Sequence, residues 1–66
     1  MSEQTSCLVK DASLHIDLAL TSVAAADCLY REAGEMARVV MTMLATDRLV
    51  YALRQLEQLC EEADDE

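Results

Sequence analysis

The residues of this chain best suited to chemistry are one histidine and three cysteines: His15, Cys7, Cys28 and Cys60. Imidazole and thiol groups act as bases, nucleophiles and metal ligands, but catalysis needs partner groups within hydrogen-bond reach. Cys7 lies two helical turns before His15, and Asp11 is the only acid that a helix would place beside that histidine. Such an Asp–His pair is an ordinary surface contact on most helices. We therefore predict no catalytic residues and no enzymatic activity.

The cysteines also lack the spacing of a zinc site, which brings ligands in pairs about two to four residues apart. No such pair occurs in this sequence. We therefore predict no metal and no cofactor, and we interpret the cysteines as small buried apolar side chains in a reducing compartment. For His15 two roles stay open: packing at a helix interface, or titration close to neutral pH.

The elements that must position these residues are helices, because the residues that interrupt helices are nearly absent. The 66 residues include no proline and one glycine, Gly34. This pattern predicts an all-α fold, an antiparallel helical hairpin with helices over about residues 6–32 and 35–61 and a turn at Gly34. One alternative stays open, because the heptad pattern continues past Gly34. A single helix over about residues 6–45 would then turn at residues 46–47.

The first predicted helix carries a heptad stripe of mostly small residues, which we interpret as its seam against the second helix: Leu8, Ala12, His15, Ala19, Ser22, Ala26 and Leu29. Small side chains in a seam allow two helices to approach closely. Thr5 or Ser6 is expected to cap this helix. A turn centred before Gly34 would place Cys7 opposite Cys60 and Val23 opposite Leu44.

Each predicted helix also carries a second apolar stripe that a single partner helix cannot cover. From these stripes we predict a partner-binding surface of six residues: Leu14, Leu18, Val39, Met43, Val50 and Leu53. Soluble monomers rarely expose contiguous apolar patches of more than several hundred Å². We therefore expect the hairpin to form a homodimer with the architecture of a four-helix bundle, or to dock on another helical protein.

The net charge of −8 is unevenly distributed, because residues 61–66 contain five acids and no base. A block of like charges predicts a disordered acidic tail, which leaves residues 1–60 as the helical hairpin domain. The five basic residues occur singly. Nucleic-acid binding uses clustered lysine and arginine to neutralise phosphates, so we expect no direct nucleic-acid contact.

The first residues lack a basic segment followed by an apolar one, so we expect no signal peptide. The apolar stretch at residues 37–45 is far shorter than the roughly 20 residues that span a bilayer. We therefore expect a cytoplasmic protein that does not contact a membrane.

Together these features predict a non-enzymatic helical interaction protein, an adaptor, small chaperone or regulator, that acts through apolar helix–helix docking. The alternative is an acidic inhibitor that covers the basic surface of a DNA-binding protein. The two hypotheses differ in salt dependence, because salt screens electrostatic contacts far more than apolar ones.

Overall fold

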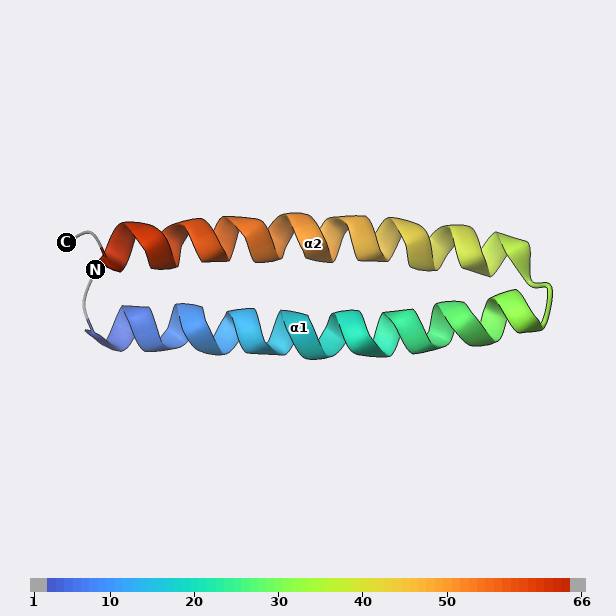
Figure 1. The fold of residues 1–66 in the computed structure, drawn as a ribbon, viewed down its shortest axis with the longest axis horizontal. Helices are drawn as coiled ribbons and strands as arrows, with labels where there is room; N and C mark the ends of the chain where they lie inside the picture. The colour runs from blue at the N-terminus through green and yellow to red at the C-terminus, as the bar shows by residue number, and fades with distance from the viewer. Residues whose placement is uncertain (1–2, 65–66) are drawn as a thin grey trace.

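A computed structural model describes residues 3–64 as two long helices joined by a tight turn. Helix α1, Glu3–Glu32, and helix α2, Met36–Asp64, run antiparallel, so that α1 begins where α2 ends (Figure 1). The Cα positions extend over 49 × 14 × 11 Å. The all-α hairpin is therefore confirmed, and the alternative of one helix that continues through Gly34 is excluded.

The turn depends on the backbone of Gly34, whose φ is +72°. The amide of Gly34 donates to the carbonyl of Arg31 at 3.1 Å, and the amide of Glu35 donates to the carbonyl of Tyr30 at 2.9 Å. This pair of hydrogen bonds is the Schellman motif, which ends a helix at a residue with positive φ. A Cβ at Gly34 would meet no atom within 4 Å, so glycine is required for its backbone conformation and not for space.

Both helices are longer than the sequence pattern predicted. Helix α1 begins at Glu3, so Thr5 and Ser6 lie inside it and do not cap it. The carboxylate of Glu3 lies in the first turn, where the helix dipole favours negative charge. Helix α2 extends through residues 61–64, which the sequence pattern assigned to an acidic tail, and residues 65–66 of that tail lie outside the described part. Glutamate and alanine propagate helices well, and acids in a last turn cost only about 0.3–1 kcal/mol each.

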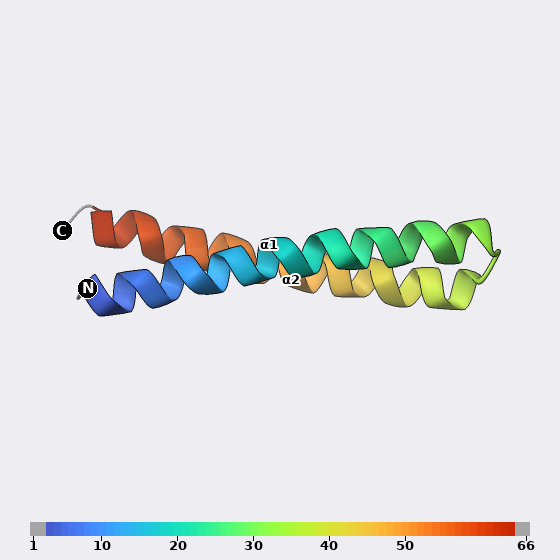
Figure 2. The ribbon, with the colours of Figure 1, turned by 90° about the horizontal axis from the view of Figure 1, so that it is seen from below.

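The two helices meet along residues that recur at alternating spacings of three and four. These seam residues are Val9, Ser13, Ile16, Leu20, Val23, Asp27 and Tyr30 on α1, and Val39, Thr42, Thr46, Leu49, Leu53, Leu56 and Cys60 on α2. Val39 is buried and the others are half-buried. Such spacing is typical of a left-handed coiled coil, and the helices cross at a small angle (Figure 2).

The stripe of α1 that faces α2 is shifted by one residue from the predicted seam. Leu8, His15 and Leu29 are exposed, while Val9, Ile16 and Tyr30, which have larger side chains than most of the predicted stripe, face α2. Helix α1 is apolar on several sides, so two heptad stripes satisfied the same pattern. The fold uses the stripe with larger side chains, because it removes more apolar area from water.

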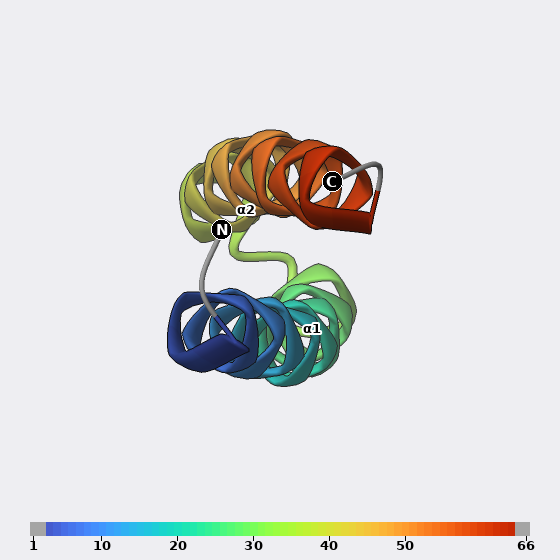
Figure 3. The same cartoon turned by 90° about the vertical axis from the view of Figure 1, so that its left-hand side faces the viewer.

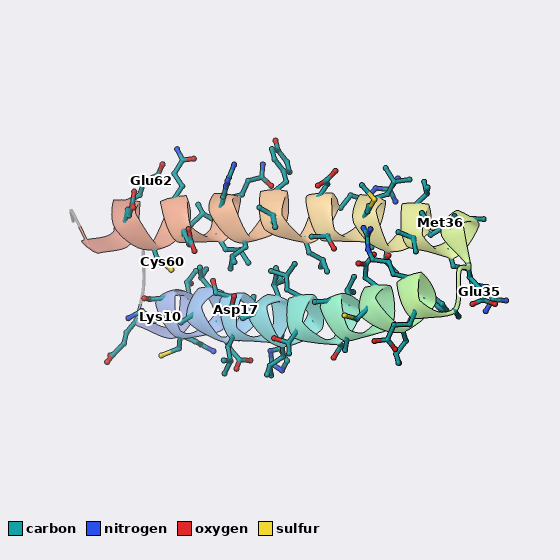
Figure 4. All side chains as sticks on the ribbon, turned by 45° about the vertical axis from the view of Figure 1, so that its right-hand side comes forward. Lys10, Asp17, Glu35, Met36, Cys60 and Glu62 are labelled. Carbon is teal, nitrogen blue, oxygen red and sulfur yellow. The ribbon has the colours of Figure 1, made fainter. Side chains whose placement is uncertain are left out.

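The register of the two helices is fixed by a contact between Asp27 and Thr42. The Thr42 hydroxyl donates to Asp27 Oδ1 at 2.6 Å. Facing residues therefore have numbers that add up to 69 and not to the predicted 67, so Cys60 is opposite Val9 and not opposite Cys7. The difference arises because the Schellman motif places both Gly34 and Glu35 in the turn. Figure 4 shows Cys60 on the side of α2 that faces α1.

Candidate docking surface

The hairpin leaves most of its large apolar side chains in contact with solvent. Seen end-on, two helices lie side by side, and each exposes most of its circumference (Figure 3). Among the described residues only Val39 is buried, whereas eleven large apolar residues are 39–68% exposed: Leu8, Leu14, Leu18, Leu29, Met36, Val40, Met41, Met43, Leu44, Tyr51 and Leu59. The apolar surface of this fold is thus mostly outside the seam.

Five of the six residues predicted to bind a partner fall into two groups, and Val50 belongs to neither. Leu14, Leu18 and Met43 are 52–59% exposed and are accessible to another molecule. Val39 and Leu53 lie in the seam, where Val39 is only 1% exposed, so the hairpin itself occupies both positions. Val50 is half-buried beside the seam. The heptad pattern could not separate the two groups, because it did not fix which stripe of each helix faces the other helix.

One flank of the seam is lined by alanines at heptad spacing, a feature that the second helix shares with the first. We call this surface the alanine flank. It contains Ala12, Ala19 and Ala26 on α1 and Ala45 and Ala52 on α2. It also includes the residues beside them on the same side: Leu8, Arg38, Met41 and Leu59. Its five alanines are half-buried, whereas Leu8 and Met41 are 64% and 68% exposed.

The alanine flank is hollowed near the turn. This turn-end groove has a volume of about 370 Å³ and is lined by Val23, Ala26, Tyr30, Arg38, Met41, Thr42 and Ala45. The guanidinium carbon of Arg38 lies 5.6 Å from the centre of the Tyr30 ring, a cation–π distance, so these two side chains form one wall together. Apart from Arg38 and Thr42, the lining is uncharged and mostly apolar.

A second hollow lies at the other end of α2. It has a volume of about 560 Å³ and is lined by Ala52, Gln55, Leu56, Gln58, Leu59 and Glu62. Glu62 is on the side of α2 that points away from α1 (Figure 4). Ala52 and Leu59 of the alanine flank line this hollow, so the flank continues toward the end where α1 begins and α2 ends, which we call the open end.

The opposite flank has a different chemical character. Its groove, of about 320 Å³, is lined by Ala24, Asp27, Met43, Thr46 and Asp47, and so contains two carboxylates. The Thr42 hydroxyl, and then Arg31, whose Nε donates to Asp27 Oδ2 at 2.6 Å, hold the pKa of Asp27 below its ordinary value. This groove therefore stays negatively charged at neutral pH, which makes it a poor site for an apolar side chain.

His15 and the cysteines do not converge. The side chain of His15 is 70% exposed, and its Nδ1 lies 2.8 Å from the carbonyl oxygen of Asp11 and 3.7 Å from the carboxylate of Asp11. The predicted surface contact is thus present, but His15 does not pack in the seam. Cys7 and Cys28 are exposed and Cys60 is half-buried, so the expectation of three buried thiols was wrong. Within the described residues no cluster of three or more His, Cys, Asp or Glu side chains is arranged to hold a metal.

Helix α1 is long and apolar enough to cross a membrane by length and composition alone, and none of its most apolar stretch is buried in the hairpin. Core helices of soluble proteins pass the same test, so this property is weak support for a membrane span. The mostly apolar stretch at residues 37–45 lies outside this helix, and the apolar residues of α1 do not form one continuous run. In α1 the apolar residues alternate with alanine, serine and threonine, and no lysine or arginine occurs between Lys10 and Arg31.

Comparisons of the chain with models of protein families, with curated proteins and with solved structures found no match.

Proposed function

We propose that this chain is a non-enzymatic interaction protein, an adaptor, small chaperone or regulator, that acts by docking apolar helix surfaces. The hairpin associates with a second copy of itself or with another helical protein, and the product is a four-helix bundle. The exposure of eleven large apolar side chains against one buried valine is the observation that carries this proposal. Helix α1 exposes the large apolar side chains of Leu8, Leu14, Leu18 and Leu29 outside the seam, and exposed apolar surface of this kind is typical of an interaction site.

The surface area of the hairpin supports association on a quantitative basis. Its accessible area is 5060 Å², whereas a folded monomer of 7.3 kDa exposes about 4,200 Å². The excess, roughly 900 Å², is similar to the roughly 800 Å² that each partner buries in a standard protein–protein interface. One interface of ordinary size would therefore give this chain the exposed surface of a typical folded protein.

Sedimentation equilibrium at micromolar concentration tests the proposal. We expect a mass of twice the 7.3 kDa chain for the purified protein, and a helical circular dichroism spectrum. A helical species that stays at 7.3 kDa and is thermally stable would contradict self-association, and only docking on another protein would then remain. A cell extract fractionated by size, with the chain detected by antibody, would distinguish that remaining case from a free monomer.

A second candidate function, inhibition of a DNA-binding protein, is favoured by the charge of the open end. Residues 1–18 and 50–66 contain nine acids and two bases, a net charge of −7. Such a surface is suited to cover a basic, phosphate-binding face. Affinity for a basic protein that falls steeply with added salt would favour this function, whereas apolar docking would change little.

A further inference from the structure

The turn-end groove and two exposed leucines lie on the same flank at opposite ends of the hairpin. The groove has a volume of about 370 Å³, and its mostly apolar lining is accessible from solvent. Leu8 and Leu59 are 64% and 39% exposed, and their numbers place them at nearly the same level of the open end. The alanine flank therefore carries both an apolar depression and an apolar projection, separated by about 27 Å along α1 at 1.5 Å per residue.

This arrangement is complementary to itself. Residue 17 is halfway between Leu8 and Ala26, and residue 52 is halfway between Ala45 and Leu59. Those two levels face each other in the register set by Asp27 and Thr42. A two-fold axis through that level would therefore bring the leucines of each copy to the groove of the other, and both contacts would form at once. Such an interface is closed, because each copy presents the same surface to the other.

We propose that the occupant of the turn-end groove is a second copy of this chain, docked antiparallel through the alanine flank, with Leu8 and Leu59 of each copy in the groove of the other. This inference rests on the proposed self-association and specifies its face and its direction. At the two-fold axis Ala19 and Ala52 have the smallest side chains that still bear a Cβ, so the helices of the two copies can approach closely there.

The charge distribution favours the antiparallel direction. Residues 19–49, the half of the hairpin near the turn, contain four acids and three bases, a net charge of −1, whereas the open half has a net charge of −7. A parallel pair would place two strongly negative ends side by side. An antiparallel pair places each negative end beside a nearly neutral one, which lowers the repulsion.

One pair of oppositely charged residues at the edge of the alanine flank also favours the antiparallel direction. Arg38 lines the turn-end groove and Glu62 lines the hollow at the open end of the same flank. The midpoint of their numbers is residue 50, close to the level of the proposed axis. Antiparallel docking therefore brings Arg38 of one copy toward Glu62 of the other. The portion of α1 on this flank carries no lysine, arginine or carboxylate that would be desolvated.

Two matched leucine variants test the face. Leu8 and Leu18 are both on α1 and are 64% and 59% exposed, and they differ in helical phase, because Leu8 is four residues before Ala12 whereas Leu18 is one residue before Ala19. We expect Leu8→Asp to raise the dimer dissociation constant at least about tenfold, because each dimer would bury two unpaired charges. Leu18→Asp should change it by less than about threefold. Both substitutions are at exposed positions, so the helical circular dichroism signal should be retained in both variants.

Charge reversal tests the direction. We expect Arg38→Glu and Glu62→Arg each to weaken the dimer about fivefold, and the double variant to recover most of the loss. The dissociation constant is measured by sedimentation equilibrium at low salt. A double variant weaker than either single variant would overturn the antiparallel direction.

The outcomes separate the two proposals. If the wild-type chain is a monomer at micromolar concentration, self-association itself fails. If it is a dimer that Leu18→Asp disrupts and Leu8→Asp does not, self-association stands and the alanine flank is the wrong face.

Discussion

The two halves of the hairpin are stabilised in different ways. Near the turn, the seam adds polar contacts to the buried Val39: the Thr42 hydroxyl donates to Asp27 across the helices, Arg31 holds the other oxygen of Asp27, and Thr46 donates to the carbonyl of Thr42 at 2.9 Å. In the open half the seam is formed mainly by the apolar residues Val9, Ile16, Leu53 and Leu56, with no cross-helix hydrogen bond at these positions.

The two halves therefore have different roles, one in setting the register of the helices and the other in stabilising the hairpin. Hydrogen bonds to a carboxylate require one alignment of donor and acceptor, so the turn half specifies the register. The free energy gained from apolar contact is proportional to the buried area and depends little on how the side chains are aligned. The open half therefore stabilises the hairpin without specifying its register. We therefore expect substitutions in the open half to have the larger effect on stability. Substitutions in the turn half should have the larger effect on whether the helices adopt a single register.

The largest expected effect is that of Leu53→Asp in the open half. A carboxylate in the seam has no partner and loses hydration, which costs about 3–5 kcal/mol, and that is most of the stability of a chain of this length. We expect the variant to be largely unfolded at 25 °C by circular dichroism. Leu44→Asp, on the same helix but at a side chain that is 51% exposed, is the control and should stay helical. A folded Leu53→Asp variant would show that Leu53 lies outside the seam.

Thr42→Val tests the turn half with a smaller expected effect. The variant keeps the shape of threonine but removes the hydroxyl that donates to Asp27 and lies 2.8 Å from the carbonyl of Val39. We expect a melting temperature about 5 °C lower. Thr46→Val is the matched control, because the Thr46 hydroxyl bonds only within its own helix.

The register should respond more than the stability does. A spin label on each helix, at Lys10 and Gln58, would report a broader distance distribution in Thr42→Val than in Thr46→Val. Equally narrow distributions in both variants would contradict a register role for Asp27 and Thr42.

The turn was predictable from sequence for a physical reason that the seam phase did not share. A single glycine in an otherwise helical chain is the one position that adopts positive φ without strain, and Gly34 does so. The phase of α1, by contrast, could be read from two apolar stripes one residue apart. Which stripe faces α2 depends on total burial against a second helix, and that is a property of the packed pair rather than of either helix alone.

The register and the docking grooves were beyond the reach of sequence patterns for a related reason. Asp27 reads as an ordinary polar residue in a heptad, and only its distance to Thr42 shows that it sets the alignment. The alanines were recognised as small seam residues, yet Ala19 and Ala26 lie beside the seam and are half-buried. A hollow formed by residues from two helices appears only when their relative rotation is known.

Acid should weaken the turn half. The pKa of Asp27 is lowered below its ordinary value of 3.8 in the folded chain, by the hydrogen bond from Thr42 and then by Arg31. A carboxyl with a lowered folded pKa contributes stability that is present above its unfolded pKa and is lost as the pH falls through the folded pKa.

Comparison of the wild type with Asp27→Asn isolates this effect. We expect the wild type to have the higher urea midpoint near pH 6, with a difference that shrinks steadily below about pH 4. Both chains are measured at one protein concentration, since association adds concentration-dependent stability. A difference that stays constant down to about pH 2 would mean that the charge of Asp27 contributes nothing to the turn half.

Deletion of residues 61–66 has the smallest expected effect on the fold. Four of these residues belong to α2, whose 29 residues together with the 30 of α1 form the helical part of the chain. Circular dichroism should therefore lose about 7% of its helical signal, in proportion to the residues removed.

The melting temperature of this truncated chain should change by less than about 3 °C, because acids are unfavourable beside the negative end of the helix dipole and, among the described side chains, Glu61 and Glu62 make no ion pair. A much larger loss of helix would mean that the last turn of α2 packs on something that stabilises the open half. If the fold persists while salt-sensitive binding to a basic protein disappears, the open end is a binding surface, and inhibition of a DNA-binding protein becomes the better account of the function.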